Sequence, residues 1–313
     1  MSFDLNYILA LLNSTIRSTT PVLLAALGNL MCSQVGAFNI ALEGQLLIGS
    51  FVSIVVNYYT HSVLLSILRG IIAGALVGAL VGVLQIKYKG ADMVIGTSVN
   101  ILVMGLTSIF LSVIWGVRGG FKSPELVTIS KIKIPFLSDL PIIGDLLTNL
   151  TIIDYLSYII AILIYIYLYK TVSGFRFRSV GYNAKAAKSL GINDERTKIN
   201  SFIISGALCG LGGVSLSMGQ VTLFIEGMTA GRGYIAMAAA NMGRQHPIYS
   251  IFSSLFFGAF QAFGTALQNI IPSQLTMTIP YIFTIAAIAL FGHRSKKAKK
   301  KHLIGGILNE KTR

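Results

Sequence analysis

Long apolar runs recur along the chain, and they constrain its fold more than any other feature. Seven runs reach or approach the ~20 residues that a helix needs to cross the ~30 Å hydrocarbon core of a bilayer. They are Ile40–Tyr59, Leu64–Tyr88, Met93–Trp115, Ile152–Lys170, Ile199–Met218, Ile248–Ile271 and Thr276–Phe291. None alternates as a strand does, and lipid offers the backbone no hydrogen bonds, so each run predicts a helix.

Composition supports the same conclusion. Hydrophobic residues make up 54% of the 313 residues and charged residues only 12%, whereas a soluble domain carries roughly 25% charged residues. Most side chains therefore do not face water. We predict an all-α protein in the cell membrane, a polytopic transmembrane helical bundle of about 8–10 spans.

The distribution of charge predicts the orientation of these spans. Residues 293–313 carry eight Lys or Arg against one Glu, and residues 170–198 carry seven against two acids. Between residues 116 and 154, four positive and four negative charges balance. Because positive loops stay in the cytoplasm, we predict a cytoplasmic loop 172–198, a basic cytoplasmic tail 293–313 with the C-terminus, and an extracellular loop 116–151. The basic residues suit contact with membrane lipid, and we expect no nucleic acid partner.

The segments that flank these spans are less regular. Residues 1–18 place apolar side chains at helical spacing, which predicts either an interfacial helix or the start of the first span. Pro21–Met31 is long enough for only a short span. Thr229–Met242 reaches only ~21 Å as a helix, so it must be short, broken or extended, beside protein or a water-lined cavity.

Glycines recur every fourth residue at Gly70, Gly74, Gly78 and Gly82. This spacing leaves one face of the helix nearly flat, and small residues allow helices to approach closely in lipid. We interpret these glycines as packing residues. Gly206 and Gly210 repeat the pattern.

The sequence contains none of the common catalytic motifs. It lacks a G-x-x-x-x-G-K-[ST] phosphate loop, an H-E-x-x-H pair and a C-x-x-C pair. The four histidines are too scattered to hold a metal, and Cys32 and Cys209 lie in apolar runs. We therefore expect no enzyme, no metal site and no cofactor bound by this chain.

Two polar segments stand out against this apolar background. The first, Gly36–Gln45, places a carboxylate, two amides and two glycines at the start of a span. Polar groups at this depth are costly and usually face a bundle interior or a cavity. Asn39 and Glu43 either line a path or bond neighbouring helices.

The second segment lies in the basic loop. Asn183 is a good N-cap and Gly191 a good helix stop, which predicts a short helix between them. Ala184, Ala187 and Leu190 would form a small apolar edge, suited to a groove on a soluble partner. A solvated helix that binds anionic lipid is the alternative.

Both segments resemble the permease subunits of ABC importers in the ribose, branched-chain amino acid and nucleoside branch. The loop is similar to that family's motif G-x-x-x-R-x-x-G-x-N-x-x-A-A-x-x-x-G-I, which docks on the ATPase. The matching residues are Gly174, Arg178, Gly181, Asn183, Ala186, Ala187, Gly191 and Ile192. The segment Ala236–Phe257 also resembles a late span of the family, and the resemblance covers about residues 20–292.

Within that branch, Asn39 to Gln45 resembles the nucleoside permeases more than the Asp-Leu-Ser or Asn-Leu-Ala-His-Gly versions of the sugar and amino acid members. The resemblance implies a transmembrane permease domain, 19–292, that translocates nucleosides in an ATP-driven importer. It implies four partners. They are a second homologous permease subunit, a cytoplasmic ABC ATPase that binds ATP and Mg²⁺, an extracellular nucleoside-binding lipoprotein, and the nucleoside. The Asn183–Leu190 helix would be the coupling helix.

A nucleoside is uncharged, so amides and aromatic rings would suit its path. The candidate path residues are Phe38, Asn39, Glu43, Gln45, Asn100, Gln220, Gln261, Phe263 and Gln268. Bonding between helices is the alternative role for each.

Three other functions remain open from the sequence. An ABC permease for a sugar, an autoinducer or a branched-chain amino acid would have the same fold. An ion-coupled secondary transporter would use membrane-embedded acids, for which only Glu43 and Glu226 qualify. A structural membrane protein would transport nothing.

Overall fold

The computed structural model of the protein describes residues 5–132 and 150–267. Its longer helices are α1 (Leu5–Gln34), α2 (Leu42–Thr60), α3 (Val63–Gly82), α4 (Asp92–Trp115), α7 (Ile152–Lys170), α10 (Asp194–Val214) and α12 (Pro247–Leu267). The shorter helices are α8 (Val172–Tyr182), α9 (Ala184–Ser189) and α11 (Arg232–Met242), and π-helical turns η1 (Val83–Lys87) and η2 (Ser215–Val221) extend α3 and α10. The predicted span Thr276–Phe291, the basic tail 293–313 and Gln268 lie outside the described residues.

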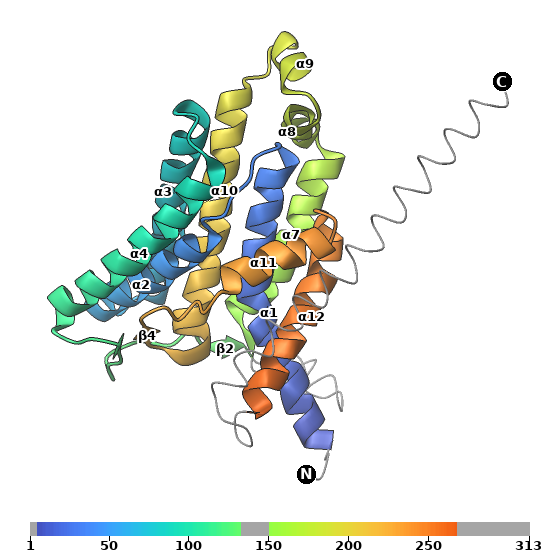
Figure 1. Ribbon diagram of the computed structural model, residues 1–313. Coiled ribbons are helices and arrows are strands. Elements are labelled where there is room, and N and C mark those ends of the chain that lie inside the picture. The colour runs from blue at the N-terminus through green and yellow to red at the C-terminus, as the bar shows by residue number, and fades with distance from the viewer. Residues whose placement is uncertain (1–4, 133–149, 268–313) are drawn as a thin grey trace.

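Six of the helices are long and apolar enough to cross a membrane. They run roughly along one direction, with α8 and α9 together at one end, called here the α9 end (Figure 1). This confirms the polytopic helical fold. Helices α2 and α11 are not among these six, and the six are counted over residues 5–132 and 150–267 alone.

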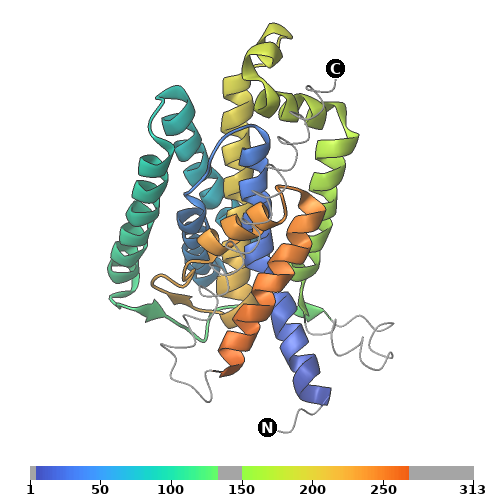
Figure 2. The ribbon, with the colours of Figure 1, turned by 45° about the vertical axis from the view of Figure 1, so that its right-hand side comes forward.

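Helices α1 and α10 form the centre of the bundle. Helix α10 packs on α1, α2 and α3, while α1 also packs on α11 and α12. Figure 2 places α3 and α4 on one side of this centre and α7 on the other. Accordingly, Asp194–Val221 has the largest share of buried residues among the candidate spans: 72% of the residues in its apolar stretch are buried.

The glycine face of α3 lies directly on α10. A Cβ atom at Gly74 would lie 2.8 Å from Gly210 Cα, and one at Gly78 would lie 3.2 Å from Gly206 Cα. At Gly82 it would meet the ring of Phe202. The two backbones are therefore in contact, an arrangement that only glycine permits on both sides.

The sequence left two forms open for the N-terminal segment, an interfacial helix or the start of the first span, and the structure agrees with the second. Residues 5–18 do not form a separate interfacial helix, and Pro21–Met31 is not a separate short span. A single helix, α1, continues through both and contains Pro21. It starts at the end of the bundle opposite α9 (Figure 1).

Two elements begin partway through the bundle. The chain leaves α1 at the α9 end, passes through residues 35–41 as a loop, and starts α2 near mid-height (Figure 1). Helix α11 is 11 residues long and lies obliquely across the same level (Figure 1). The expectation of a short, broken element near Thr229–Met242 is confirmed.

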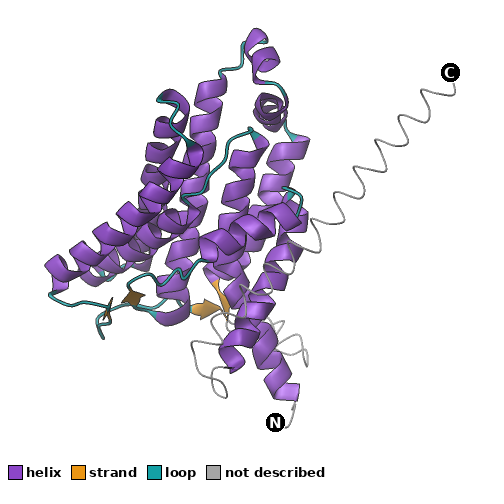
Figure 3. Ribbon diagram, viewed as in Figure 1, coloured by secondary structure: helices purple, strands orange, loops and turns teal. Residues whose placement is uncertain are grey.

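Short strands join the segments at the end opposite α9. Strand β1 (Gly120–Phe121) pairs with β4 (Phe224–Ile225), and β2 (Lys131–Ile132) pairs with β3 (Leu150–Thr151). These two-residue ladders were not expected from the sequence. They tie the loop after α4 to the exit of α10 and to the start of α7 (Figure 3).

Candidate functional site

The start of α2 meets the start of α11 at mid-height in the bundle. Glu43 lies in the first turn of α2, and its two carboxylate oxygens accept hydrogen bonds from Gly231 N and Gly233 N, each at 2.7 Å. Gly231 is the N-cap of α11 and has a positive φ of 74°. A carboxylate at this position satisfies backbone N–H groups that a helix leaves unpaired and also complements the helix dipole.

This geometry depends on glycine at the start of α11. A Cβ atom at Gly233 would lie 2.7 Å from Glu43 Cα, so a side chain there would force the two helices apart. A carboxylate is costly in a membrane unless it is paired. Here the glycines let it bond directly to backbone N–H groups. In this structure Glu43 therefore joins α2 to α11.

Asn100 of α4 connects three other parts of the same site. Its Oδ1 accepts from Gly44 N at 2.8 Å. Its Nδ2 donates to Ile40 O at 3.0 Å and to Tyr234 Oη at 3.1 Å. One amide therefore holds the loop before α2, the first turn of α2 and the first turn of α11.

Asn39 and Gln45 complete the network on the side of α10. Both are fully buried. Asn39 Nδ2 donates to Ser205 Oγ at 2.9 Å and to Gln45 Oε1 at 3.2 Å, while its Oδ1 accepts from Ala41 N. These contacts fold the loop before α2 and fix it to α10, and they use both polar atoms of the Asn39 amide but only the oxygen of the Gln45 amide.

Two aromatic side chains of this region are exposed. Phe38 is 39% exposed and Tyr234 is 45% exposed. Because the Tyr234 oxygen accepts from Asn100, its proton remains available as a donor. Sequence reasoning missed Tyr234, although the preceding Gly231-Arg232-Gly233 signalled a break at which side chains become accessible. We call Phe38, Asn39, Glu43, Asn100 and Tyr234 the break site.

The structure places the other path candidates elsewhere. Gln220 Nε2 donates to Arg17 O at 2.9 Å. That carbonyl lacks its usual helical partner because Pro21, four residues on, has no N–H. Gln261 and Phe263 lie in the half of α12 that points away from the α9 end (Figure 1). Gln45 adjoins the break site through its hydrogen bond from Asn39.

A second candidate region is the surface formed by α8 and α9, called here the α8–α9 surface. Helix α8 is fixed by close contacts, since a Cβ atom at Gly174 would lie 2.7 Å from Leu168 Cα and one at Gly181 would lie 3.1 Å from Gly36 N. The Arg178 guanidinium stacks 4.3 Å from the centre of the Tyr169 ring. These three motif residues thus anchor α8 to the ends of α7 and α1.

Burial lowers the pKa of His246, whose ring packs 5.0 Å from that of Tyr169.

Helix α9 has the predicted ends. Asn183 Oδ1 accepts from Ala186 N at 3.1 Å, and Gly191 has a positive φ of 80°. The predicted apolar edge of Ala184, Ala187 and Leu190 is wrong for Ala187. That side chain is only 2% exposed and packs in a cluster with Phe177 and Val180 of α8. The sequence did not reveal α8 as a helix, and it is α8 that covers Ala187.

The outward face of the α8–α9 surface is strongly apolar. Tyr182, Leu190 and Phe175 are 84%, 80% and 68% exposed. A groove of about 270 Å³ runs between the two helices. Its lining residues are Phe175, Arg178, Ser179, Tyr182, Asn183, Ala186, Ala187 and Leu190. Exposed apolar surface of this kind marks a site for a binding partner.

The described residues contain no group of His, Cys, Asp or Glu that could hold a metal ion. The two regions offer hydrogen bonds, aromatic faces and an apolar groove.

Comparison with known proteins gives one family. The model of the branched-chain amino acid transport system / permease component family matches residues 11–288. No solved structure matches the chain significantly.

Two relatives are similar to this chain over most of their length, and a third over part of it. The guanosine ABC transporter permease protein NupQ of Bacillus subtilis is 32% identical, covering 91% of this chain and 93% of its own. The nucleoside ABC transporter permease protein NupC of Lactococcus lactis is also 32% identical, covering 87% and 89%. The nucleoside ABC transporter permease protein NupB of the same organism is 34% identical over 42% of this chain and 37% of its own.

Proposed function

The chain belongs to the branched-chain amino acid transport system / permease component family, and from this premise we propose that it is the membrane-spanning subunit of an ATP-driven importer of nucleosides. The observation that carries the substrate class is the 32% identity to a guanosine permease over 91% of this chain. The exposed aromatic rings and amide network of the break site are compatible with an uncharged base and a ribose.

We place the nucleoside path at the break site. Irregular backbone at membrane depth is tolerated only where it is buried in protein or lines a water-filled cavity. Loop 35–41 and the segment before α11 are both irregular; Asn100 links the loop to α11, and Glu43 links α2 to Gly231. The face of the base stacks on Phe38 or Tyr234, and the free Tyr234 proton is donated to an acceptor on the nucleoside. Glu43 and Asn100 position these groups and do not need to contact the substrate.

The energy for transport comes from a partner. A cytoplasmic ABC ATPase binds ATP and Mg²⁺ and docks in the groove of the α8–α9 surface, where Tyr182, Leu190 and Phe175 are exposed. Its closure moves α8 and α9, and Gly174 and Gly181 transmit that movement directly to α7 and α1. The ATPase can bias the transporter only by binding one conformation more tightly than the other.

Two further partners complete the importer. A second homologous permease subunit pairs with this chain, which accords with the separate NupB and NupC permeases of one relative's organism. An extracellular nucleoside-binding lipoprotein delivers the substrate to the end of the bundle opposite α9. The α9 end and the C-terminus are then cytoplasmic.

Reconstitution tests this proposal. Proteoliposomes that contain the chain, its second permease, the ATPase and the binding protein should accumulate radiolabelled guanosine or adenosine only when ATP and Mg²⁺ are supplied. Uptake of ribose or leucine in place of nucleosides would assign the chain to another branch of the family. Uptake driven by an ion gradient without ATP would assign it to the secondary transporters.

A single variant tests the docking surface. Ala186 is exposed and lines the groove, so Ala186→Glu should abolish copurification of the ATPase while leaving membrane insertion unchanged. Lys185→Ala is the control, because Lys185 is on the same helix but does not line the groove. If the ATPase copurified equally with both variants, the groove would not be the docking site.

A further inference from the structure

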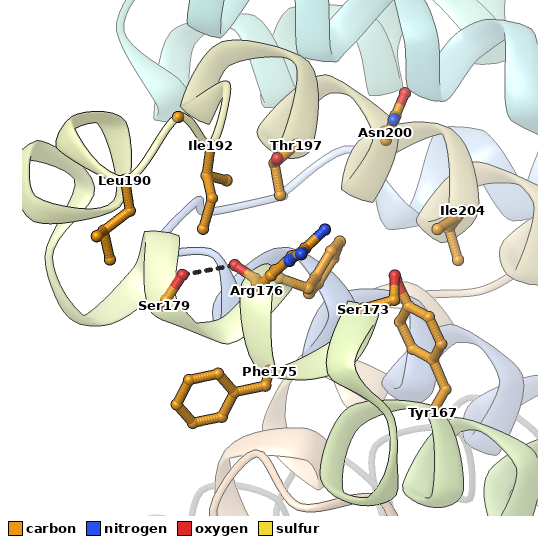
Figure 4. A pocket seen from close by; sticks show the side chains of 12 residues that line it. Tyr167, Ser173, Phe175, Arg176, Ser179, Leu190, Ile192, Thr197, Asn200 and Ile204 are labelled. Atoms are coloured by element: carbon orange, nitrogen blue, oxygen red, sulfur yellow. Dashed lines mark hydrogen bonds between the residues drawn. The ribbon is translucent and has the colours of Figure 1, made fainter.

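A second and larger cavity lies beneath α9. Its volume is about 620 Å³, within the range of roughly 300–1,000 Å³ typical of ligand sites. Figure 4 shows it between α8 and the start of α10, with residues 190–192 closing one end. It lies on the other side of α8 from most of the docking groove, with which it shares only Phe175, Ser179 and Leu190.

The cavity is suited to an anion. None of the twelve residues that line it is acidic, and Arg176 is its one cation. The Arg176 side chain extends into the space between the two helices (Figure 4). Within residues 5–132 and 150–267 its guanidinium has no hydrogen bond or ion pair. A planar guanidinium without a carboxylate binds phosphate well, because its N–H groups match two phosphate oxygens.

Neutral donors surround this charge. Ser173, Thr197 and Asn200 line the cavity, and the Tyr167 hydroxyl lies 3.3 Å from Ser173 Oγ. These donors come from α7, α8 and α10, so three elements contribute polar groups to the lining. An anion in the cavity would therefore receive hydrogen bonds from both of its walls.

The end of α7 beside the cavity carries the residue types that are typical of the lipid headgroup level. The last turns of α7 contain Tyr165, Tyr167, Tyr169 and Lys170, and such residues mark the boundary between membrane and water. Tyr167 itself lines the cavity. Apolar side chains lie beside the polar ones, from Phe177 on α8 and Ile204 on α10. A ligand here meets a cation, hydroxyl groups and hydrocarbon side chains.

We infer that this cavity binds the phosphate headgroup of an anionic phospholipid, with Arg176 as the principal contact. The proposed orientation places it in the cytoplasmic leaflet, where anionic lipids are abundant. The inference does not depend on which substrate the protein transports. A lipid bound here would fill the space behind α8 and hold that helix against α10.

Native mass spectrometry of the purified full-length chain tests the inference. We expect phosphatidylglycerol to remain bound and phosphatidylcholine to be lost. Arg176→Gln should weaken phosphatidylglycerol binding about tenfold, as expected for the loss of a charge-assisted hydrogen bond. Asn200→Leu should weaken it by a smaller factor. The matched control is Lys185→Gln, which removes one positive charge from the same loop outside the cavity.

Three results would overturn the inference. The first is equal retention of phosphatidylglycerol by Arg176→Gln and Lys185→Gln. Lipid binding would then depend on the overall positive charge and not on the cavity. The second is unchanged binding by both Arg176→Gln and Asn200→Leu. The third is displacement of the lipid by millimolar inorganic phosphate, which would identify a soluble phosphate compound as the natural ligand.

Discussion

Glu43 shows how a single side chain can be both costly and necessary in a membrane. Its carboxylate is half-buried at mid-height in the bundle, where an unpaired charge is strongly disfavoured. Two backbone N–H groups at 2.7 Å compensate that cost. In return, the side chain joins two helices that each begin inside the bundle.

Glu43→Gln tests this role. A glutamine side chain can accept from one N–H group, but its amide nitrogen would face the other. We expect the free energy of unfolding to fall by about 1–3 kcal/mol, the cost of leaving a buried donor unsatisfied, and uptake to be lost. Thermal unfolding in detergent measures the first effect and reconstituted transport the second.

The control for this variant is Glu226→Gln. Glu226 also accepts from a backbone N–H group, that of Gly119 at 3.1 Å, but in an exposed loop. Its substitution should change the free energy of unfolding by less than about 0.5 kcal/mol. Equal effects of the two substitutions would contradict the special role of Glu43.

At the scale of elements, the contact between α3 and α10 depends on the absence of side chains. Gly70, Gly74 and Gly78 lie against Gly206 and Gly210 at distances that leave no room for a methyl group. In lipid, where burial of apolar surface gives little drive for association, such close contact supplies much of the attraction. The same device joins α8 to α7 at Gly174.

Gly74→Ala and Gly105→Ala should have opposite effects. A Cβ atom at Gly74 would lie 2.8 Å from Gly210 Cα, whereas one at Gly105 of α4 would meet nothing within 4 Å. Overpacking at Gly74 should cost about 1–3 kcal/mol. Gly105→Ala should be neutral or should stabilise its helix by up to about 1 kcal/mol. Thermal unfolding in detergent measures the stability of the two variants. Equal destabilisation would rule out packing as the reason for the glycine spacing.

At the scale of the whole molecule, the two candidate regions lie at different depths. The break site is at mid-height, while the α8–α9 surface is at one end (Figure 1). The segments that connect them are short, because loop 35–41 joins the top of α1 to α2, and Gly181 of α8 touches that loop at Gly36. A movement of α8 would reach the break site through this loop.

Accessibility labelling tests the orientation that this arrangement requires. In intact cells, Lys122→Cys should react with a membrane-impermeant maleimide, because the proposed orientation places the β1 loop outside. Lys185→Cys should react only after the cells are permeabilised. The native Cys32 and Cys209 are both buried and serve as the unlabelled background. The reverse pattern would overturn the assignment of α9 to the cytoplasm.

The sequence by itself determined the features that arise from local physics. Hydrophobic length predicted the spanning helices, and the caps Asn183 and Gly191 predicted α9, because hydropathy and capping depend on neighbouring residues. The apolar run Thr229–Met242 is too short to cross the membrane as a helix, and this also predicted the short α11.

Only the tertiary structure decided which partner each polar group has. Glu43 bonds to Gly231, 188 residues away, and Gln220 bonds to the carbonyl of Arg17 that Pro21 leaves free. Ala187 faces inward because α8 covers it. Such partners are set by how distant segments pack, and a pattern within one helix contains no information about the helix that lies against it.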